Sequence, residues 1–261
     1  MNTPVTDSRF GFSYTAPHQP GELLAFEGLC QAFEHSPLPL ARRLQNFPRH
    51  IRRQDLARFL VRSELFKQVL DVNGSIVEGG VFCGGGVMTW AHLSAIYEPY
   101  NHTRRIFGLD TFSGFPDAHE RDTASGGTAR AESGQLSTHA DMKEEIEALV
   151  KLHDENRPLG HIPKVHLLAG DARDSIPKLL AEHPHLLISL LYLDFDLYEP
   201  TKCALQTLLP RVVAGGIVAF DELNCPQFPG ETSALLEEVD LSRAKLRRFP
   251  IDPYISYFIK Q

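Results

Sequence analysis

Four acidic residues stand at or just after the ends of apolar, strand-like segments of this chain. They are Asp110, Asp171, Asp194 and Asp221. Because the carboxyl ends of parallel strands meet at one edge of a sheet, a ligand bound there would meet all four carboxylates. A single Asp at such a place is more often a turn or helix-cap residue. Four of them in register with four strands favour a binding site.

A glycine turn precedes these acids in the chain. Segment 75–82 is apolar and partly β-branched, glycines occupy 84–86, and a helix is expected over 87–97. A strand, a glycine turn and a helix form the first unit of a nucleotide-binding fold. The dinucleotide fingerprint needs a glycine where Thr89 stands, so NAD is disfavoured. Glu78, just before the turn, would repel a pyrophosphate and attract a cation, which favours S-adenosylmethionine (SAM).

The place of each acid in the chain suggests a separate role. Asp110, after the second strand, suits the ribose hydroxyls of SAM, because a carboxylate accepts two hydrogen bonds from a diol. Asp171, after the third strand, is placed to bind the adenine amino group. Asp194, Asp221 and Glu222 form an oxygen-only cluster, which suits Mg²⁺ better than zinc. A network of salt bridges with arginine is the alternative for this cluster.

The same cluster indicates a reaction. A divalent cation there would bind two adjacent hydroxyls of a substrate, lower the pKa of one and orient it toward a methyl donor. A base must then accept the proton, and the candidates are Asp196, His139 and Asp194. His139 is the weakest of them, because a lone histidine in a loop is usually a surface residue.

Strand-like and helical segments alternate from residue 75 onward. Expected strands cover 75–82, 105–110, 164–169, 187–193, 217–220, 245–249 and 254–259, and expected helices cover 87–97, 140–154, 174–182, 199–209 and 231–239. This alternation predicts an α/β fold. We expect a Rossmann-like, doubly wound and mostly parallel sheet of seven strands, with an antiparallel last strand. Segment 187–193 is the most hydrophobic strand and is expected at the centre of the sheet.

Residues 1–73 are predicted to form an arm and helices that cap the substrate site or contact another copy, and residues 74–261 the SAM-binding domain. Helices are expected over 22–34 and 54–70. The second has an apolar stripe of Leu56, Phe59, Leu60, Phe66, Val69 and Leu70. Arginines 42, 43, 49, 52 and 53 could contact a phosphorylated substrate, although a solvated basic face is the simpler interpretation. Loop 111–139 is long and polar, and is predicted to be a lid.

Length and composition limit the class of protein. With 261 residues and 43% hydrophobic content, the chain can bury one large core. A net charge of −7 and a pI of about 5.9 disfavour nucleic acid as a partner. The longest apolar run, 186–193, is far shorter than the roughly 20 residues of a membrane span, and no signal peptide is evident. The four cysteines form no C-x-x-C pair, which indicates a reducing, cytoplasmic location.

Four segments together resemble the macrocin O-methyltransferase family of class I SAM-dependent sugar O-methyltransferases. They are VEGGVFCGG at 77–85, LDTFSGFP at 109–116, LDFDLYEPT at 193–201 and GGIVAFDE at 215–222. The resemblance implies a Mg²⁺-dependent enzyme that methylates a deoxysugar hydroxyl in a glycosylated natural product or a nucleotide-sugar. It also implies a homo-oligomer.

The resemblance assigns roles to particular residues. The methionine part of SAM would lie against Glu78, Gly79, Gly80, Gly84 and Gly85, and the ribose against Asp110 and Ser113. Asp194, Asp221 and Glu222 correspond to the metal ligands of the family. The chain departs from the family pattern at Cys83, where a basic residue is usual, and at Glu222, where Asp is common.

Three other functions remain open from the residues alone. A catechol-type phenol also presents adjacent oxygens, so a phenol O-methyltransferase would need the same acidic cluster. A non-catalytic SAM-binding module would need only the glycine turn. An oxidoreductase is the third alternative, and Thr89 argues against it.

Overall fold

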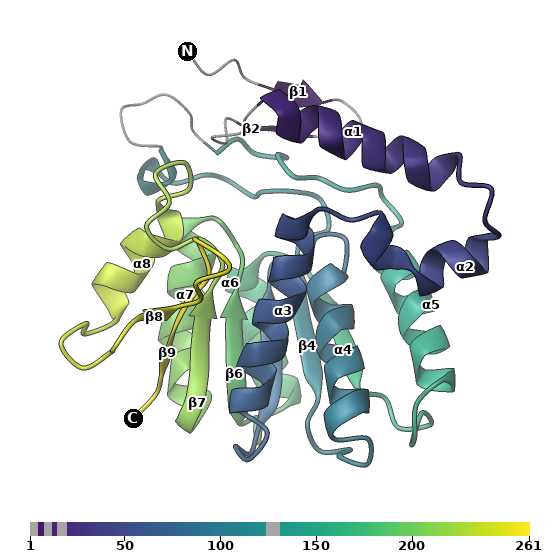
Figure 1. The fold of residues 1–261 in the computed structure, drawn as a ribbon. Coiled ribbons are helices and arrows are strands. Elements are labelled where there is room, and N and C mark those ends of the chain that lie inside the picture. Colours follow the sequence, from purple (N-terminus) through teal and green to yellow (C-terminus); the bar gives the residue numbers. More distant parts are fainter. Residues whose placement is uncertain (1–4, 8–11, 15–19, 124–130) are drawn as a thin grey trace.

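Seven strands form one sheet at the centre of the protein. In the computed structural model, which describes residues 5–7, 12–14, 20–123 and 131–261, the strand order is β5-β4-β3-β6-β7-β9-β8 (Figure 1). The strands are β3 (Ser75–Gly79), β4 (Ile106–Asp110), β5 (Val165–Ala169), β6 (Ile188–Leu193), β7 (Val212–Phe220), β8 (Arg247–Arg248) and β9 (Ser256–Ile259). The first five are parallel, whereas β9 runs antiparallel to β7 and β8. The predicted fold class is therefore confirmed.

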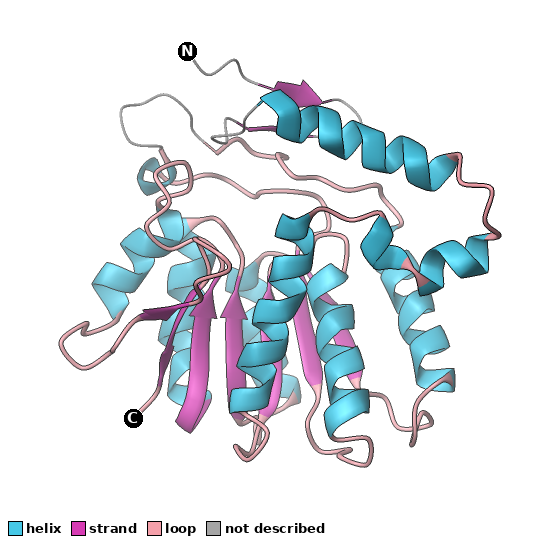
Figure 2. Ribbon diagram, viewed as in Figure 1, coloured by secondary structure: helices cyan, strands magenta, loops and turns pink. Residues whose placement is uncertain are grey.

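Helices cover both faces of this sheet. One layer holds α3 (Arg53–Gln68), α4 (Gly85–Tyr97) and α5 (Met142–Glu155), and the other holds α6 (Ala172–Glu182), α7 (Tyr198–Leu208) and α8 (Gly230–Glu238) (Figure 2). The connections between parallel strands bring their carboxyl ends to one edge, at the top of Figure 1. No helix in the described part of the chain is long and apolar enough to cross a membrane.

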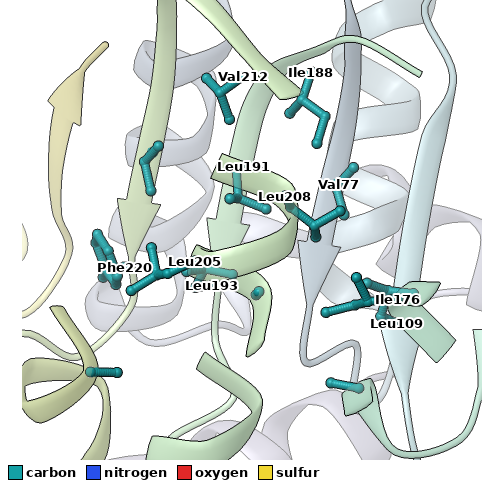
Figure 3. Close-up of a cluster of buried hydrophobic side chains, with 14 of the residues drawn as sticks. Val77, Leu109, Ile176, Ile188, Leu191, Leu193, Leu205, Leu208, Val212 and Phe220 are labelled. Atoms are coloured by element: carbon teal, nitrogen blue, oxygen red, sulfur yellow. The ribbon is translucent and has the colours of Figure 1, made fainter. Parts of the chain in front are cut away.

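The core consists of two clusters because neighbouring residues of a strand point to opposite faces of the sheet. In β6, Leu190 and Tyr192 pack in the cluster with α3 and α4, whereas Leu191 and Leu193 pack in the cluster with α6 and α7. Figure 3 shows the second cluster. All four side chains are fully buried, so β6 is a central strand, as its composition predicts.

The predicted apolar stripe of α3 is buried only in part. Phe66 and Val69 of this stripe are buried, whereas Phe59, Leu60 and Leu70 are exposed, and Val61 and Leu65 are buried in addition. Arg62 is also on the buried face of α3. The prediction was wrong for the three exposed residues because the buried face of this helix includes a charged residue, which an apolar pattern does not register.

Strand β7 begins earlier than expected, at Val212. The pair Gly215-Gly216 suggested a turn before the strand, but it lies inside β7. Gly215 has φ +81, a backbone conformation that favours glycine. The glycine pair is thus a local irregularity of one strand, beside a shift in the β6–β7 register.

The N-terminal region lies over the carboxyl edge of the sheet. It contains β1 (Val5–Asp7), β2 (Phe12–Tyr14), α1 (Pro20–Glu34), α2 (Leu40–Gln45) and the short η1 (Phe47–Arg49). α1 crosses above the sheet in Figure 1, whereas α3 packs on the sheet itself. α3 therefore belongs to the core of the sheet, whereas α1 lies outside it.

The described parts of loop 111–139 run between α1 and the sheet (Figure 1). Phe115 and Ala131, from the two arms of the loop, are buried together with Leu197. The short helix η2 (Glu120–Asp122) lies in the first arm. Residues 124–130, in the middle of the predicted lid, lie outside the described residues.

Candidate active site

The turn between β3 and α4 requires glycine at particular positions. Gly80 and Gly84 have φ +85 and +82, which L side chains rarely adopt. A Cβ at Gly80 would overlap the carbonyl oxygen of Asp194, so the β3 turn and the end of β6 touch through backbone atoms. α4 starts at Gly85, slightly before the predicted start, and its first N–H groups have no partner within the helix.

Glu78 is a buried acid beside this turn. Its side chain is 1% exposed, its Oε1 lies 3.6 Å from Nη2 of Arg62, and its Oε2 has no hydrogen-bond partner among the described residues. Burial raises the pKa of Glu78 to about 7, although Arg62 opposes the shift. Glu78 also lines the main cavity. An unpaired carboxylate oxygen at this place suits a cationic ligand.

Asp110 shapes the two loops around it. Its Oδ2 accepts hydrogen bonds from the N–H groups of Val81 (2.7 Å) and Phe82 (2.8 Å), and its Oδ1 accepts one from Phe112 (2.7 Å). Asp110 lines the cavity, as predicted for a ribose-binding residue. Oδ2 already accepts two bonds, but Oδ1 can accept one more, so the role at the ribose stays a prediction.

Two other residues predicted to bind the cofactor, Asp171 and Ser113, do not line the cavity. The Asp171 carboxylate accepts a hydrogen bond from the N–H of Arg173 as the N-cap of α6, and it forms an ion pair with the Arg173 side chain at 2.6 Å. Ser113 is exposed, and its neighbours Thr111 and Gly114 line the cavity instead. The helix-cap interpretation accounts for the contacts of Asp171. To bind the adenine, Asp171 would first have to break its contacts with Arg173.

The acids after β6 and β7 converge on the same cavity. Asp194, Asp196, Asp221 and Glu222 all line it, together with Glu78 and the glycine turn. The N–H of Asp194 donates to Gly79 O at 2.8 Å, and the N–H of Asp221 donates to Leu193 O at 2.9 Å. These ladder bonds hold the acid-bearing ends of β3, β6 and β7 side by side. Of the four acids predicted to meet at this edge, Asp110, Asp194 and Asp221 line the cavity, whereas Asp171 does not.

Two arginines of α3 reach into the acids, and the sequence did not reveal them. Arg58 forms an ion pair with Asp221, whose other oxygen accepts a 2.5 Å hydrogen bond from the Tyr192 hydroxyl. Arg62 lies 3.6 Å from Asp194 and stacks over the Tyr192 ring at 4.8 Å. Although burial would raise the pKa of Asp221, Arg58 and Arg62 hold it below its usual value. Their spacing of four residues on one helix was the available signal.

The arrangement of the acids does not fit a bound metal ion as it stands. In the described ranges, no three His, Cys, Asp or Glu side chains are grouped so that they could hold one. Arg58 and Tyr192 occupy both oxygens of Asp221, and Arg62 is near Asp194. The salt-bridge alternative from the sequence therefore describes the observed contacts. One oxygen of Glu222 remains buried without a described partner.

Of the three candidate bases, Asp194 and Asp196 line the cavity and His139 does not. The His139 ring is half exposed and lies 2.9 Å from Glu145 Oε2. Burial, with Glu222 and Asp194 nearby, raises the pKa of Asp196 well above its usual value. Burial and Asp221 raise the pKa of Asp194 as well. Asp196 forms no ion pair with a cationic side chain in the described parts of the chain, so its carboxylate is the freer of the two.

The cavity continues beyond the acids toward the N-terminal helices. It has a volume of about 810 Å³. Its outer wall includes Arg52, Arg53 and Phe59 of the α3 region and Phe228 and Tyr254 from the C-terminal half. Of the arginines between 42 and 53, only Arg52 and Arg53 belong to this wall, and Arg42 and Arg43 make local bonds away from it.

Several known proteins are similar to this chain. The sequence model of the family described as macrocin-O-methyltransferase (TylF) matches residues 57–233. The crystal structure of CalS11, calicheamicin methyltransferase, is 37% identical with a TM-score of 0.89, and the match covers 94% of each chain. The apo structure of CalS11, TDP-rhamnose 3'-O-methyltransferase, is 34% identical with a TM-score of 0.81, covering 94% of this chain and 96% of that chain.

A curated relative matches over a shorter stretch. Demethyldecarbamoylnovobiocin O-methyltransferase of Streptomyces niveus is 29% identical over 157 residues, which are 60% of this chain and 55% of that protein. The matched part of the chain thus spans about half the length of this relative.

Proposed function

Because the chain belongs to the macrocin O-methyltransferase family, we propose that it transfers the methyl group of SAM to a hydroxyl of a deoxysugar. One observation carries this proposal: a single cavity is lined both by Glu78 with the glycine turn and by the acids after β6 and β7. A methyl donor and its acceptor must meet in one enclosed space for direct transfer.

The donor end is built for a cation. The Glu78 carboxylate, which lines the cavity, would attract the ammonium group of SAM. A Cβ at Gly85 would meet open space, and Gly85 lines the cavity, so the backbone there can approach the ligand closely. Asp110 holds the loop on the other side of the turn, and its remaining acceptor capacity suits the ribose.

The acceptor end is built to remove a proton. We assign the role of general base to Asp196. Its carboxylate takes the proton of the acceptor hydroxyl while the hydroxyl oxygen attacks the methyl carbon of SAM. One O–C bond forms, one S–C bond breaks, and S-adenosylhomocysteine leaves as a neutral thioether. A raised pKa makes Asp196 a stronger base than an ordinary aspartate.

A requirement for Mg²⁺ is a separate part of the proposal. Arg58 and Arg62 are the cationic groups that act on Asp194 and Asp221, and Asp196 and Glu222 add two further carboxyl groups, so negative charge is in excess among these described residues. A cation would relieve this repulsion, but Arg58 would have to leave Asp221. Dialysis against EDTA tests the requirement. Activity that is lost on dialysis and restored by Mg²⁺ supports the requirement, and full activity without metal contradicts it.

The acceptor is proposed to be a nucleotide-sugar or a sugar-bearing natural product. The name of CalS11 gives TDP-rhamnose as the acceptor of that protein, which supports the first option here. Arg52 and Arg53 at the outer wall could meet a diphosphate. If they do, the double variant Arg52→Ala and Arg53→Ala raises the acceptor KM without changing SAM affinity. An unchanged KM excludes this contact.

A panel of acceptors tests the function directly. The protein is incubated with methyl-labelled SAM and TDP-rhamnose, other TDP-deoxysugars, glycosides or catechols, and the products are analysed by mass spectrometry. Label on a sugar oxygen supports the proposal, and label on a catechol alone favours the phenol alternative. SAM binding by calorimetry without transfer to any acceptor favours a non-catalytic module.

The proposal also includes a cytoplasmic homo-oligomer. The exposed apolar residues Leu24, Leu40 and Leu44 on α1 and α2 support a contact between copies. Light scattering of the purified protein tests this, and a monomeric mass at micromolar concentration contradicts it.

A further inference from the structure

Helix α8 places a carboxyl group in the interior, directly behind the acids of the cavity. Glu231, in the first turn of α8, is fully buried. It does not line the cavity, although Asp194, Asp196, Asp221 and Glu222 all do. In the sequence, Glu231 is the first residue of the helix expected over 231–239.

The carboxyl group of Glu231 accepts hydrogen bonds from two separate loops. Its Oε1 accepts from the N–H groups of Phe195 (3.1 Å) and Asp196 (3.4 Å), which follow β6. Its Oε2 accepts from the N–H of Glu222 (3.2 Å), which follows β7. One side chain therefore ties together the two loops that carry the candidate base and the acidic pair.

The first of these loops contains a left-handed residue. Asp196 has φ +61, in the left-handed region that residues other than glycine, asparagine and aspartate rarely adopt. Such a conformation persists only where the surroundings hold it. Glu231 bonds the N–H of Asp196 itself, and a Cβ at Gly79 would overlap the Phe195 ring, so this ring is packed closely on β3. The carboxyl of Asp196 is thereby fixed relative to both β3 and β7.

A buried carboxylate near Asp221 and Glu222 is costly, because like charges repel in the interior. A neutral apolar residue would avoid this repulsion but would leave three N–H groups without this acceptor. A glutamine could serve one loop through its carbonyl oxygen, but its NH₂ group would face an N–H donor of the other loop. Of these alternatives, only the carboxylate can accept from both loops at once.

We propose that Glu231 is a positioning residue, which holds the Asp196 loop and the Glu222 loop in the geometry that methyl transfer needs. This inference rests on the proposed function. Glu231 acts through backbone atoms, so its effect is on the placement of Asp196 and Glu222 and not on the binding of SAM. A displacement of about 1 Å at a reacting group can cost roughly 100-fold in rate.

Two variants and one control test this role. Glu231→Gln keeps the size of the side chain and breaks the bonds to one loop, and Glu231→Ala breaks the bonds to both. Glu237→Gln is the control, because Glu237 is on the same helix and in ion pairs with Arg121 and Lys202, away from the cavity. For Glu231→Gln we expect kcat to fall about 10- to 100-fold, with the SAM Kd within about twofold of the wild type. For Glu237→Gln we expect an unchanged kcat.

Hydrogen exchange gives a readout that is independent of activity. In Glu231→Ala, amide exchange should accelerate in the peptides around 195–196 and around 222, with no comparable change in β3 or β4. Unchanged exchange in either loop, or an unchanged kcat in Glu231→Gln, would overturn the proposal. If the wild type transfers no methyl group to any acceptor, the proposed function fails. Faster exchange in both loops would then still support the structural half of this inference.

Discussion

Asp196 is the residue that we propose as the base for the proton transfer. Replacement of Asp196 by Asn keeps the shape of the side chain but removes the base. We expect kcat to fall by about 10²–10⁴-fold, the usual contribution of a general base. Calorimetry should give an unchanged SAM affinity, because the main donor contacts lie at Glu78 and the glycine turn. His139→Asn is the matched control, since His139 is bonded to Glu145 outside the cavity. Equal losses in both variants would contradict the assignment of the base.

If Glu78 binds SAM as proposed, the affinity for SAM should depend on pH. Its pKa is raised to about 7 by burial, so the free protein carries the carboxylate above that pH and the neutral acid below it. We expect the SAM Kd to rise as the pH falls, approaching tenfold per unit in the range below about pH 7. Glu78→Gln should bind SAM about 10- to 100-fold more weakly, with no such dependence. Calorimetry from about pH 8.5 to about pH 5.5 measures both, and a pH-independent wild-type Kd contradicts the role.

The sequence allowed prediction of the acids at this site but not of their partners. Asp194 and Asp221 could be found because they end strands whose apolar pattern is clear. Arg58 and Arg62 could not, because the ion pair between Arg58 and Asp221 joins residues that are 163 positions apart. Glu231 is acidic in the first turn of a helix, where acids are common for reasons of the helix dipole. Asp171 shows the opposite case, a strand-end acid that serves as a helix cap.

At the scale of elements, Asp122 fixes one arm of loop 111–139 to α7. It is 2% exposed, and it accepts hydrogen bonds from the N–H groups of Tyr198 (2.7 Å) and His119 (2.8 Å). Asp122→Ala leaves the buried N–H of Tyr198 without this acceptor, which costs about 1–3 kcal/mol. We expect a lower thermal midpoint and faster limited proteolysis within the loop. Glu120→Ala, in the same short helix but exposed, should behave like the wild type. Proteolysis unchanged by Asp122→Ala would contradict the anchoring role.

The boundaries of helices and strands could be predicted where the sequence shows a single clear apolar pattern. They could not be predicted where glycines or a charged residue interrupt that pattern. The strands around 105–110, 164–169 and 187–193 were predicted closely because each is a short apolar run between polar turns. β7 was predicted too short, because a glycine pair indicates a turn even when it lies within a strand. The buried face of α3 was predicted only in part, because it carries Arg62 beside its apolar residues.

The stability of the whole molecule should depend on the two apolar clusters that flank the sheet. Leu191 in the centre of β6 is fully buried, and Leu187 just before this strand is 46% exposed. Leu191→Ala should lower the free energy of unfolding by about 2–5 kcal/mol, since it removes buried methyl groups and leaves a cavity. Leu187→Ala should change it by about 0.5 kcal/mol or less. Urea denaturation measures both, and similar losses would contradict the two-cluster description.

The central claim is that the acids at the carboxyl edge of the sheet and the glycine turn form one site, where a sugar hydroxyl meets the methyl group of SAM. A crystal structure of the protein with S-adenosylhomocysteine and a TDP-deoxysugar tests this most directly. We predict the sulfur beside the glycine turn and one sugar hydroxyl about 2.6–3.2 Å from the Asp196 carboxylate, facing that sulfur. A sugar bound outside this cavity, or a hydroxyl that faces the sulfur while Asp196 points away from it, would contradict the account.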